Sequence, residues 1–418
     1  MSTKLNSFID QIVRRERGRL IADLVSHLGP NRIELAEDMV HEAIVAALKQ
    51  WSFSGLPEKP AAWLNRVARN KAYDQLRKLT KETLVDELDN NLPADTTHDT
   101  ILTGSKIKDS ELELFFMCCK QNLGKKEQLA LTLNLACGFT AKDIAEVFLS
   151  TDTAIAQLLS RTKRKLRKDR VSITKETTLF DIKTSIPIIH KAVYLLFTIG
   201  YSSLKSEDTI QKDLAYEALR LMKLLLSSPQ TVTPDGQAIA ALICFQSARF
   251  NARFDQNGNI ILLKDQDQTS WDKNLIQEGF GHLKNAQKTN PLSRHHIEAA
   301  SASIHILPQT NSSYNWDQLK NLYKQLGMIV QSPIITLNRA ITEMMSGNYP
   351  QAASSLDTLT DNQQIQQYGP YYLVRGELYE KMGQKELANE QFKTAMEHNI
   401  NMPLKQLLDN RIDTIIND

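Results

Sequence analysis

The chain has 418 residues, which is long enough for two to four domains with sizeable buried cores. Its formal net charge of +2 excludes few classes of function, because the charge is unevenly distributed along the chain. Residues 161–170 hold seven cations and one acid, whereas residues 82–99 hold six acids and no Lys or Arg. The separation of charge along the chain is therefore more informative than the total.

The four cysteines are Cys118, Cys119, Cys137 and Cys244. They form no Cys-x-x-Cys pair, which favours reduced cysteines in a cytosolic protein, some of them in cores. The N-terminus has charges within a few residues and no apolar segment typical of a signal peptide. No apolar run approaches the length that crosses a membrane. We expect a soluble, cytoplasmic protein with no membrane partner, no bound metal and no cofactor.

Helical periodicity runs through nearly every segment, so we predict an all-α protein, with one small hairpin possible at Asn259–Leu263. Helices run from about residue 5 to residue 80, with breaks at Gly29–Asn31 and Ser54–Pro60. The predicted domains are 1–80, a compact helical unit at 109–172 and a long helical domain at 173–418. Between the first two lies an acidic linker at 81–108, poor in apolar residues.

The last domain ends in a weak internal repeat. Gly347 and Gly383 lie 36 residues apart, close to the tetratricopeptide period of about 34. Each glycine is followed by a small residue and then a large one, at Ala352 and Leu356 and at Ala388 and Phe392. This spacing favours tetratricopeptide-like helices, which earlier helices would extend in degenerate form. A generic helical hairpin is the alternative.

A predicted helix at Pro60–Lys78 has two contrasting faces. One arc is apolar and is expected to pack inward: Leu64, Ala68, Ala72 and Leu76. The opposite arc mixes aromatic, cationic and amide side chains: Trp63, Arg66, Arg69, Asn70, Tyr73 and Arg77. Arginines neutralise phosphates and aromatic rings stack on bases, so this arc suits single-stranded DNA. In the alternative interpretation, Trp63 belongs to the core and the arginines are merely solvated.

A helix-turn-helix pattern covers Gly138–Arg167. Thr140 and Asp143 form a capping box, residues 148–150 make the turn, and Thr151 caps the second helix. The buried face of that helix is predicted to hold Ile155, Leu159, Thr162 and Leu166. The residues expected to contact DNA are Thr153, Gln157, Ser160, Arg161, Lys163, Arg164 and Lys165. The basic tail Lys163–Arg170 would lie along phosphates. The alternative is a hairpin with a solvated basic end.

These residues resemble the extracytoplasmic-function group of sigma factors. Ala36–Ala43 resembles the segment with which that family binds the clamp helices of RNA polymerase, which implies polymerase-binding roles for Glu37, Asp38, His41 and Glu42. Pro60–Lys78 is similar to the family's minus-10 recognition helix, and Leu129–Arg167 to its minus-35 helix-turn-helix. The linker is too short for the additional domain of housekeeping sigma factors, which also fits this group.

The rest of the chain resembles one subgroup, whose members carry a long C-terminal extension ending in tetratricopeptide-like helices. The matching stretches include Phe116–Cys119, Ala192–Phe197, Gly200–Ser202, Asp213–Arg220, Leu262–Asp272 and Ser332–Ala340. The chain departs from the subgroup at Thr198-Ile199, at Lys120 and at Leu158, where Asn-Glu, His and Arg are usual. Because Leu158 lies in the recognition helix, no promoter sequence can be transferred from the family.

The resemblance implies promoter-specific initiation of transcription with core RNA polymerase, with activity regulated in cis by the C-terminal domain. An exchanged regulatory protein or ligand on that domain is the alternative mode of regulation. Two other functions stay open: a helix-turn-helix regulator with a tetratricopeptide sensor domain, and a helical scaffold with no DNA role. Binding to free duplex DNA without polymerase separates the regulator from the sigma factor.

Catalysis is not expected. The extension holds acids and histidines at Asp235, Asp265–Asp267, Asp272, His295-His296 and His305, but their spacing matches no catalytic signature. Acids in loops near glycine more often cap helices or fix turns, and Trp271 is expected to be buried. For the DNA-facing helix, Trp63→Ala or Arg69→Ala is expected to impair promoter opening with polymerase binding nearly intact. Loss of polymerase binding through misfolding would instead favour a core role for these residues.

Overall fold

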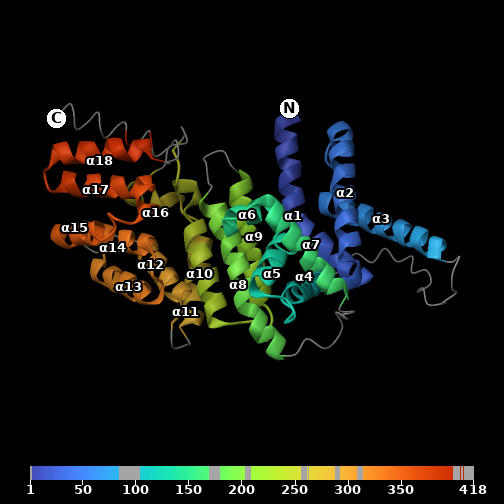
Figure 1. The fold of residues 1–418 in the computed structure, drawn as a ribbon. Coiled ribbons are helices and arrows are strands. Elements are labelled where there is room, and N and C mark those ends of the chain that lie inside the picture. The colour runs from blue at the N-terminus through green and yellow to red at the C-terminus, as the bar shows by residue number, and fades with distance from the viewer. Residues whose placement is uncertain are drawn as a thin grey trace. The chain divides into compact units, whose positions relative to one another are not determined.

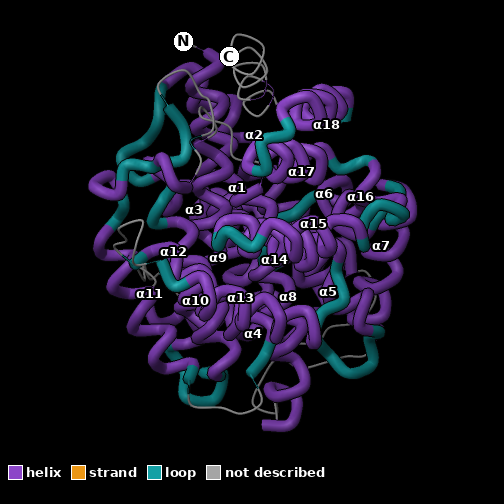
Figure 2. The backbone as a smooth tube through the Cα atoms, turned by 90° about the vertical axis from the view of Figure 1, so that its left-hand side faces the viewer, coloured by secondary structure: helices purple, strands orange, loops and turns teal. Residues whose placement is uncertain are grey.

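The computed structural model describes residues 2–83, 104–168, 179–202, 209–255, 261, 263–287, 292–307, 314–398, 405 and 408. Across these residues the regular elements are helices, with no strand (Figures 1 and 2). The predicted all-α class is therefore confirmed. The chain divides into two compact units: Met1–Ser202 with Asp213–Val232, and Ser203–Lys212 with Thr233–Asp418.

The first unit begins with three helices that match the predicted N-terminal domain. They are α1 (Ser2–Leu28), α2 (Ile33–Ser54) and α3 (Pro60–Thr83), with a short 3-10 turn at Pro30–Arg32 between α1 and α2. Both predicted breaks are confirmed, and Gly29 and Gly55 have φ values of 82° and 77°, a backbone region that favours glycine. The three helices pack together around Ile21, Ala36 and Leu64, each fully or almost fully buried. Alanines at such contacts let helices approach closely.

The same unit continues with the compact helical segment. Its helices are α4 (Gly104–Cys118), α5 (Lys125–Leu135), α6 (Ala141–Phe148) and α7 (Asp152–Lys168). Two further helices, α8 (Leu179–Ser202) and α9 (Thr209–Leu226), follow. The domain prediction placed both in the C-terminal domain, whereas α8 and most of α9 belong to the first unit. They do so because α8 packs against α4 and α5.

The sequence predicts no apolar run long enough to cross a membrane, but α8 contains one. Its segment Asp181–Tyr201 has the length and mean hydropathy, 1.3, of a membrane span. However, 50% of the apolar window is buried inside the fold. Ile186, Ile189 and Val193 are among its buried side chains. Packing against other helices thus accounts for the apolar character of this segment.

The second unit holds the remaining helices. They are α10 (Pro234–Ser247), α11 (Lys273–Ala286), α12 (Arg294–Ile306), α13 (Trp316–Ile329), α14 (Pro333–Met345), α15 (Tyr349–Asp357), α16 (Gln363–Gln366), α17 (Gly369–Lys381) and α18 (Lys385–Glu397). Three 3-10 turns, at Phe250–Ala252, Leu263–Asp265 and Gln268–Ser270, lie between α10 and α11. The pairs α14–α15 and α17–α18 form helical hairpins that turn at Gly347 and Gly383, whose φ values are 82° and 75°.

The repeat predicted at those hairpins is confirmed in the packing. Ala352 and Ala388 are completely buried, and Leu356 and Phe392 are 1% and 0% exposed. The Phe392 ring lies so close to Gly376 that a Cβ at Gly376 would be 2.4 Å from it. Large and small side chains therefore interlock within each hairpin, as in tetratricopeptide-like repeats.

Two predicted features fall largely outside the described residues. Of the linker predicted at 81–108, residues 84–103 are not described, and its ends belong to α3 and α4. Of the hairpin predicted at Asn259–Leu263, only Ile261 and Leu263 are described. The Ile261 amide donates to the Arg253 carbonyl at 2.9 Å, which is a bridge between two chain segments rather than a strand.

Candidate nucleic-acid interface

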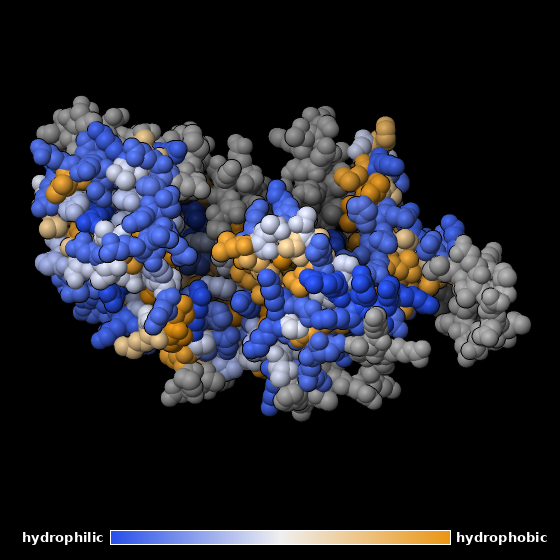
Figure 3. All heavy atoms as spheres, in the orientation of Figure 1, coloured by the Kyte–Doolittle hydropathy of each residue, from blue (hydrophilic) through white to orange (hydrophobic). Residues whose placement is uncertain are grey.

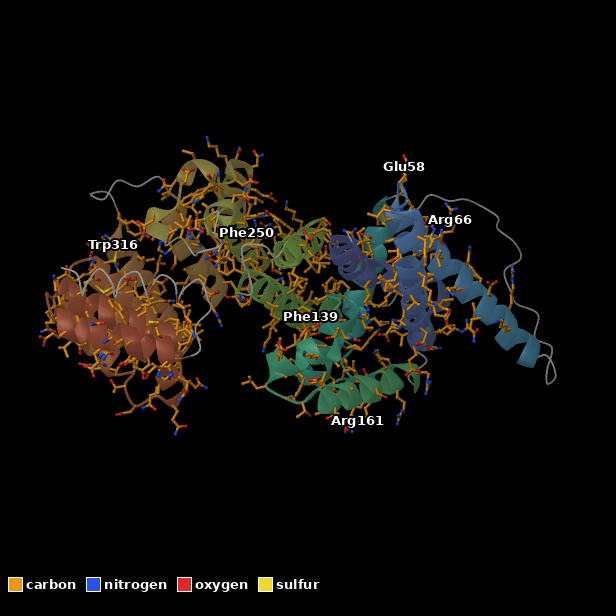
Figure 4. The ribbon with its side chains drawn as sticks, turned by 90° about the horizontal axis from the view of Figure 1, so that it is seen from above. Glu58, Arg66, Phe139, Arg161, Phe250 and Trp316 are labelled. Atoms are coloured by element: carbon orange, nitrogen blue, oxygen red, sulfur yellow. The ribbon has the colours of Figure 1, made fainter. Side chains whose placement is uncertain are left out.

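Helix α3 has the two faces that its sequence predicts. Leu64, Ala68 and Ala72 are buried, at no more than 1% exposure. On the opposite arc, four of the predicted DNA-binding residues are exposed to solvent: Arg66, Asn70, Tyr73 and Arg77. Figure 4 labels Arg66 on this helix. An exposed tyrosine beside arginines is a surface on which bases could stack and phosphates could pair.

Arg69, on the same predicted arc, is held by the fold. Its Nε and Nη2 donate to the two carboxylate oxygens of Asp23 in α1, at 2.7 and 2.8 Å. The Asp23 side chain is 3% exposed, and Asn65 also donates to it, at 3.3 Å. The hydrogen bonds that Arg69 donates to Asp23 raise the pKa of Arg69 above its usual value, against the effect of partial burial. This bidentate pair fixes α3 on α1.

Trp63 is half-buried and contacts a second tryptophan. Its ring centroid lies 5.3 Å from that of Trp51 in α2, with the planes tilted by 60°. Trp51 itself is 1% exposed. One face of Trp63 therefore contributes to the core while its remaining surface is accessible. The sequence left both roles open for Trp63, and this position is compatible with both.

The helix-turn-helix is built as its sequence predicts. The Asp143 amide donates to Thr140 Oγ1 at 3.2 Å and the Thr140 amide to Asp143 Oδ2 at 2.8 Å, completing the capping box. Thr151 Oγ1 accepts from the Ala154 amide at 3.3 Å and so caps α7. The predicted inner face of α7 is buried throughout: Ile155, Leu159, Thr162 and Leu166. These contacts aim the opposite face of α7 outward.

Six of the seven predicted DNA-binding residues of α7 are exposed. They are Thr153, Gln157, Ser160, Arg161, Arg164 and Lys165, whereas Lys163 is half-buried. Figure 3 shows hydrophilic side chains gathered over α7, and Figure 4 shows Arg161 pointing away from the helix. The exposed amide, hydroxyl and guanidinium groups are those that read base edges and bind phosphates.

The turn between α6 and α7 contains a strained residue that the sequence analysis did not single out. Leu149 has a φ of 48°, and among the described residues other than glycine it is alone in having a positive φ. Its side chain is 95% exposed, so no burial compensates for the strain. Glycine is the usual residue at this C-terminal position of a helix. The left-handed turn sets the angle at which α7 leaves α6.

Two of the predicted DNA-binding residues of α7 are paired with acids. Lys163 Nζ lies 2.7 Å from Glu37 Oε2 in α2, and these side chains are 14% and 15% exposed. Lys165 pairs with Glu127 in α5 at 2.6 Å, and that bond lowers the pKa of Glu127. Farther along α7, Arg167 lies 3.1 Å from Glu34 in α2. Helix α7 is therefore tied to α2 by two ion pairs.

The predicted polymerase-binding residues lie along α2. Asp38, His41 and Glu42 are exposed, and Glu42 accepts a bond from Lys71 at 2.8 Å, whereas Glu37 is half-buried against Lys163. Leu48, seven residues after His41 and so on the same side of the helix, is 41% exposed, and Phe53 is 94% exposed. The sequence did not reveal that Leu48 and Phe53 are exposed, because the apolar residues of α2 repeat with the 3.6-residue period of an ordinary core helix. A hollow of about 400 Å³ is lined by residues of α2, α5, α6 and α7: Glu34, Glu37, Asp38, Asn134, Ala141, Ala156, Leu159, Ser160 and Lys163.

A glycine allows α1 to lie against the helix-turn-helix. A Cβ at Gly18 would be 2.5 Å from the backbone oxygen of Ala136, so no other residue fits this contact unchanged. Next to it, Arg17 donates to the Asn134 carbonyl at 2.6 Å and to Glu37 at 3.3 Å. Burial lowers the pKa of Arg17, against the effect of the Glu37 charge. Arg17 thus joins α1, α2 and the C-terminal end of α5.

A second charged cluster joins three parts of the first unit. Arg220 in α9 donates two bonds to Glu111 in α4, at 2.7 and 2.9 Å, and pairs with Glu217 at 2.7 Å. Glu111 also faces Arg19 in α1, whose Nε lies 3.6 Å from Glu111 Oε1. Glu111 is only 5% exposed. Burial alone would lower the pKa of Arg220, but its bonds to Glu217 and Glu111 raise it overall.

The cysteines, acids and histidines outside this interface have mainly structural positions. All four cysteines are buried, and burial raises the pKa of Cys119 to about 12 and that of Cys118 and Cys137 as well, which disfavours their reactive thiolates. Asp272 caps α11, and Asp267 accepts from the Thr269 amide. Asp235 pairs with His295 at 2.8 Å. As predicted, Trp271 is buried, at 5% exposure.

Comparisons with known proteins agree with this arrangement. Residues 12–82, which span α1 to α3, match the family model of sigma-70 region 2. Residues 185–287 match a family of unknown function, DUF6596. An uncharacterized protein of Rhizobium meliloti (strain 1021) is 30% identical over 357 residues, covering 84% of this chain and 83% of the relative. A solved tetratricopeptide repeat protein from Parabacteroides merdae ATCC 43184 shares 13% identity with a TM-score of 0.34, over 74% of this chain and 98% of that one.

The region 2 match defines the class. Sigma-70 proteins are non-enzymatic factors of transcription initiation, and their general partners are core RNA polymerase and promoter DNA. This chain belongs to the sigma factors that resemble the extracytoplasmic-function group and carry a long C-terminal extension. A helix-turn-helix regulator of another kind would leave the region 2 match unexplained.

Proposed function

We propose that this protein directs core RNA polymerase to specific promoters through two separate DNA-binding helices, and that its extension regulates it in cis. The observation that carries the proposal is the pair of exposed polar faces on α3 and α7, each set by a buried apolar face on the same helix. Helix α3 would hold the unpaired minus-10 strand, and α7 would enter the major groove at minus-35. Polymerase and chromosome share the cytoplasm, where this function would be performed.

Polymerase would bind along α2. Asp38, His41 and Glu42 offer an exposed polar stripe on that helix. Leu48 and Phe53 add exposed apolar area, which is unusual for a surface that stays in water. Glu37 would complete this surface once Lys163 and Arg17 release it. Polar contacts would then orient the complex while the apolar side chains supply much of its affinity.

The residues proposed for DNA divide into those that contact it and those that position the contacts. Arg66, Asn70, Tyr73 and Arg77 would contact the single strand directly. Trp63 and Arg69 belong to the proposed minus-10 face as well. The ring contact of Trp63 with Trp51 and the hydrogen bonds of Arg69 to Asp23 indicate that they act largely by holding α3 in place. On α7, Thr153, Gln157, Ser160, Arg161 and Arg164 would contact the duplex. Lys163 and Lys165 would join them after leaving their acids.

Cis regulation would act on the ion pairs between α7 and α2. A contact of Glu37 with polymerase, or of Lys163 with a phosphate, would weaken the ion pair between these two side chains. The packed arrangement therefore competes with both partners. Each such pair contributes only about 0.5–1 kcal/mol near a surface, so a few of them shift the equilibrium without locking it. This balance is one that a regulatory domain could change.

The C-terminal extension contacts the DNA-binding part of the chain through α9. Arg220, which belongs to the extension, binds Glu111 on the segment that carries the helix-turn-helix, and Glu111 also faces Arg19 of region 2. Loss of Arg220 would leave the buried carboxylate of Glu111 with one partner fewer. We therefore infer that α8 and α9 hold the two DNA-binding parts together until polymerase or a signal separates them.

The contact residues of α3 can be tested by promoter opening. Tyr73→Ala and Arg66→Ala should bind core polymerase as the wild type does but open promoter DNA at least tenfold less, as read by a fluorescent base analogue in the melted segment. Asp74→Asn, also exposed on α3, is the matched control and should open DNA normally. Normal opening by both tested variants would overturn the role given to α3.

The role of the extension can be tested by two truncations. Residues 1–172 lack α8 and α9, whereas residues 1–232 retain the complete first unit. If α8 and α9 restrain the DNA-binding parts, 1–172 should transcribe more than 1–232 with core polymerase. Melting curves of both show whether each is folded. The point variant Arg220→Gln in the full chain gives the same test without truncation, and unchanged transcription by this variant would exclude restraint through α9.

A further inference from the structure

In the second unit, one buried cysteine lies next to two other residues that can bind metals. Cys244 of α10, Glu278 and His282 of α11 bring a sulfur, a carboxylate oxygen and an imidazole nitrogen within 4.8 Å of one another. Glu278 and His282 are four residues apart, so they share one face of α11. Both helices fall within the residues matched by the family of unknown function, 185–287.

The packing of α10 against α11 is unusually close at this point. A Cβ at Gly279 would lie 2.7 Å from the Phe245 ring and 3.2 Å from the Cys244 Cβ. Glycine at this position therefore lets α11 approach α10 closely enough for Cys244 to reach the neighbouring side chains. The neighbouring rings of Phe245 and Phe280 also pack together across the two helices, with their centroids 4.9 Å apart.

A fourth residue orients the imidazole. His282 Nδ1 lies 2.6 Å from the amide oxygen of Gln237, which can only accept, so Nδ1 carries the proton. The other nitrogen, Nε2, then faces the carboxylate of Glu278, at 3.4 Å. A hydrogen bond that fixes one ring nitrogen and directs the other at the metal is the usual arrangement around metal-binding histidines.

We propose that Cys244, Glu278 and His282 form a binding site for Zn²⁺ or a similar thiophilic divalent cation. Sulfur, nitrogen and oxygen ligands together suit zinc, whereas Mg²⁺ and Ca²⁺ prefer oxygen alone. A tetrahedral zinc site places its ligand atoms about 3.3–3.8 Å apart, which small side-chain rotations achieve here. The Glu278 and His282 side chains are 32% and 17% exposed, so an ion can reach the site from solvent.

Three protein ligands leave the fourth tetrahedral position open to water or to another ligand. A bound ion would cross-link α10 to α11 and so stiffen the beginning of the second unit. This site is independent of the proposed sigma function, because none of its residues belongs to the first unit.

The test is metal binding by the reduced full-length protein after treatment with a chelator. Titration with Zn²⁺ against a chromophoric chelator should show one tight equivalent, and Co²⁺ should give the near-ultraviolet charge-transfer band of a cobalt thiolate. Cys244→Ser should abolish that band, and His282→Gln should weaken Zn²⁺ binding at least tenfold. Zn²⁺ should also raise the melting temperature of the wild type but not of Cys244→Ser.

Two matched variants keep the test specific. Cys119→Ser removes a buried thiol of the first unit, and His295→Gln removes a histidine that pairs with Asp235, so both should bind zinc normally. Melting of every variant without metal shows whether it is folded. The proposal is overturned if the wild type binds no tight equivalent, or if folded Cys244→Ser keeps the cobalt–thiolate band.

Discussion

Helices α3 and α7 carry the two faces proposed to bind DNA, and they differ in how much of each face the fold itself uses. On α7 the face turned to solvent is available apart from Lys163 and Lys165, which pair with acids near its edge. The polar arc of α3 also includes two residues that the fold itself uses. Arg69 is bound to a buried aspartate, and Trp63 is packed on a buried tryptophan. An arginine on a polar arc is therefore a contact residue only where no buried acid lies beneath it.

The largest effect is expected from breaking the pair beneath α3. Arg69→Ala leaves the Asp23 carboxylate, 3% exposed, with Asn65 as its remaining bond from α3. Removing one partner of a buried pair costs about 3 kcal/mol, or roughly 6–12 °C in the melting temperature of a unit this size. Calorimetry of the full chain measures it, with Arg66→Ala as the exposed control, expected within about 1–2 °C of wild type. Equal melting of both variants would show that Arg69 does not hold α3.

A functional effect without a structural one is expected on α7. Arg161→Glu with Arg164→Glu replaces two exposed cations by acids, so stability should change little. Each lost contact to DNA is worth about 1–3 kcal/mol, so promoter-dependent transcription should fall at least tenfold. Lys183→Glu with Lys191→Glu, both exposed on α8, makes the same change in net charge and is the control. If transcription survived the double reversal, a scaffold with no DNA role would explain the basic helix better.

A smaller effect is expected where the two DNA-binding parts meet. Gly18→Ala places a Cβ 2.5 Å from the Ala136 backbone oxygen, so the packed arrangement is disfavoured while helix α1 itself gains about 1 kcal/mol in propensity. Full-length protein should then transcribe several-fold more than wild type with limiting polymerase. Gly281→Ala, at a helical glycine with no neighbour within 4 Å of the added Cβ, controls for propensity. Lower activity of Gly18→Ala, with an unchanged melting temperature, would mean that the packed arrangement is the active one.

The smallest effect is expected in the turn before α7. Leu149→Gly removes the strain of a positive φ from a side chain that is 95% exposed. Relief of the strain outweighs the entropy of glycine in the unfolded chain, so stability should rise by about 0.5–1 kcal/mol. The melting temperature is the measurement, and transcription should not change. A fall in stability would reveal a contact made by Leu149 that the exposed side chain does not suggest.

Local patterns made α7 predictable from its sequence, residue by residue. Thr140, Asp143 and Thr151 cap their helices through bonds to residues three positions away, and the buried face follows from a period of 3.6. The breaks at Gly29 and Gly55 and the hairpin turns at Gly347 and Gly383 are local in the same sense, because each glycine has a positive φ. Such features depend on residues that are close along the chain.

Contacts between distant residues were not predictable in this way. Asp23 and Arg69 are separated by 46 residues, and Lys163 and Glu37 by 126, so no local period relates them. Likewise, no local pattern relates Arg220 of α9 to Glu111 of α4, because 109 residues separate them. The approach of Gly18 to Ala136 depends on how two helical segments pack, which a single sequence does not encode locally.

The measurement that tests the central claim most directly is reconstituted transcription with core RNA polymerase, with and without the full chain, on a promoter library. The account predicts transcripts from a defined subset of promoters only when the protein is present, and weak binding of the protein alone to the same duplexes. Tight duplex binding without polymerase, together with no promoter-dependent transcripts, would contradict it and identify a helix-turn-helix regulator instead.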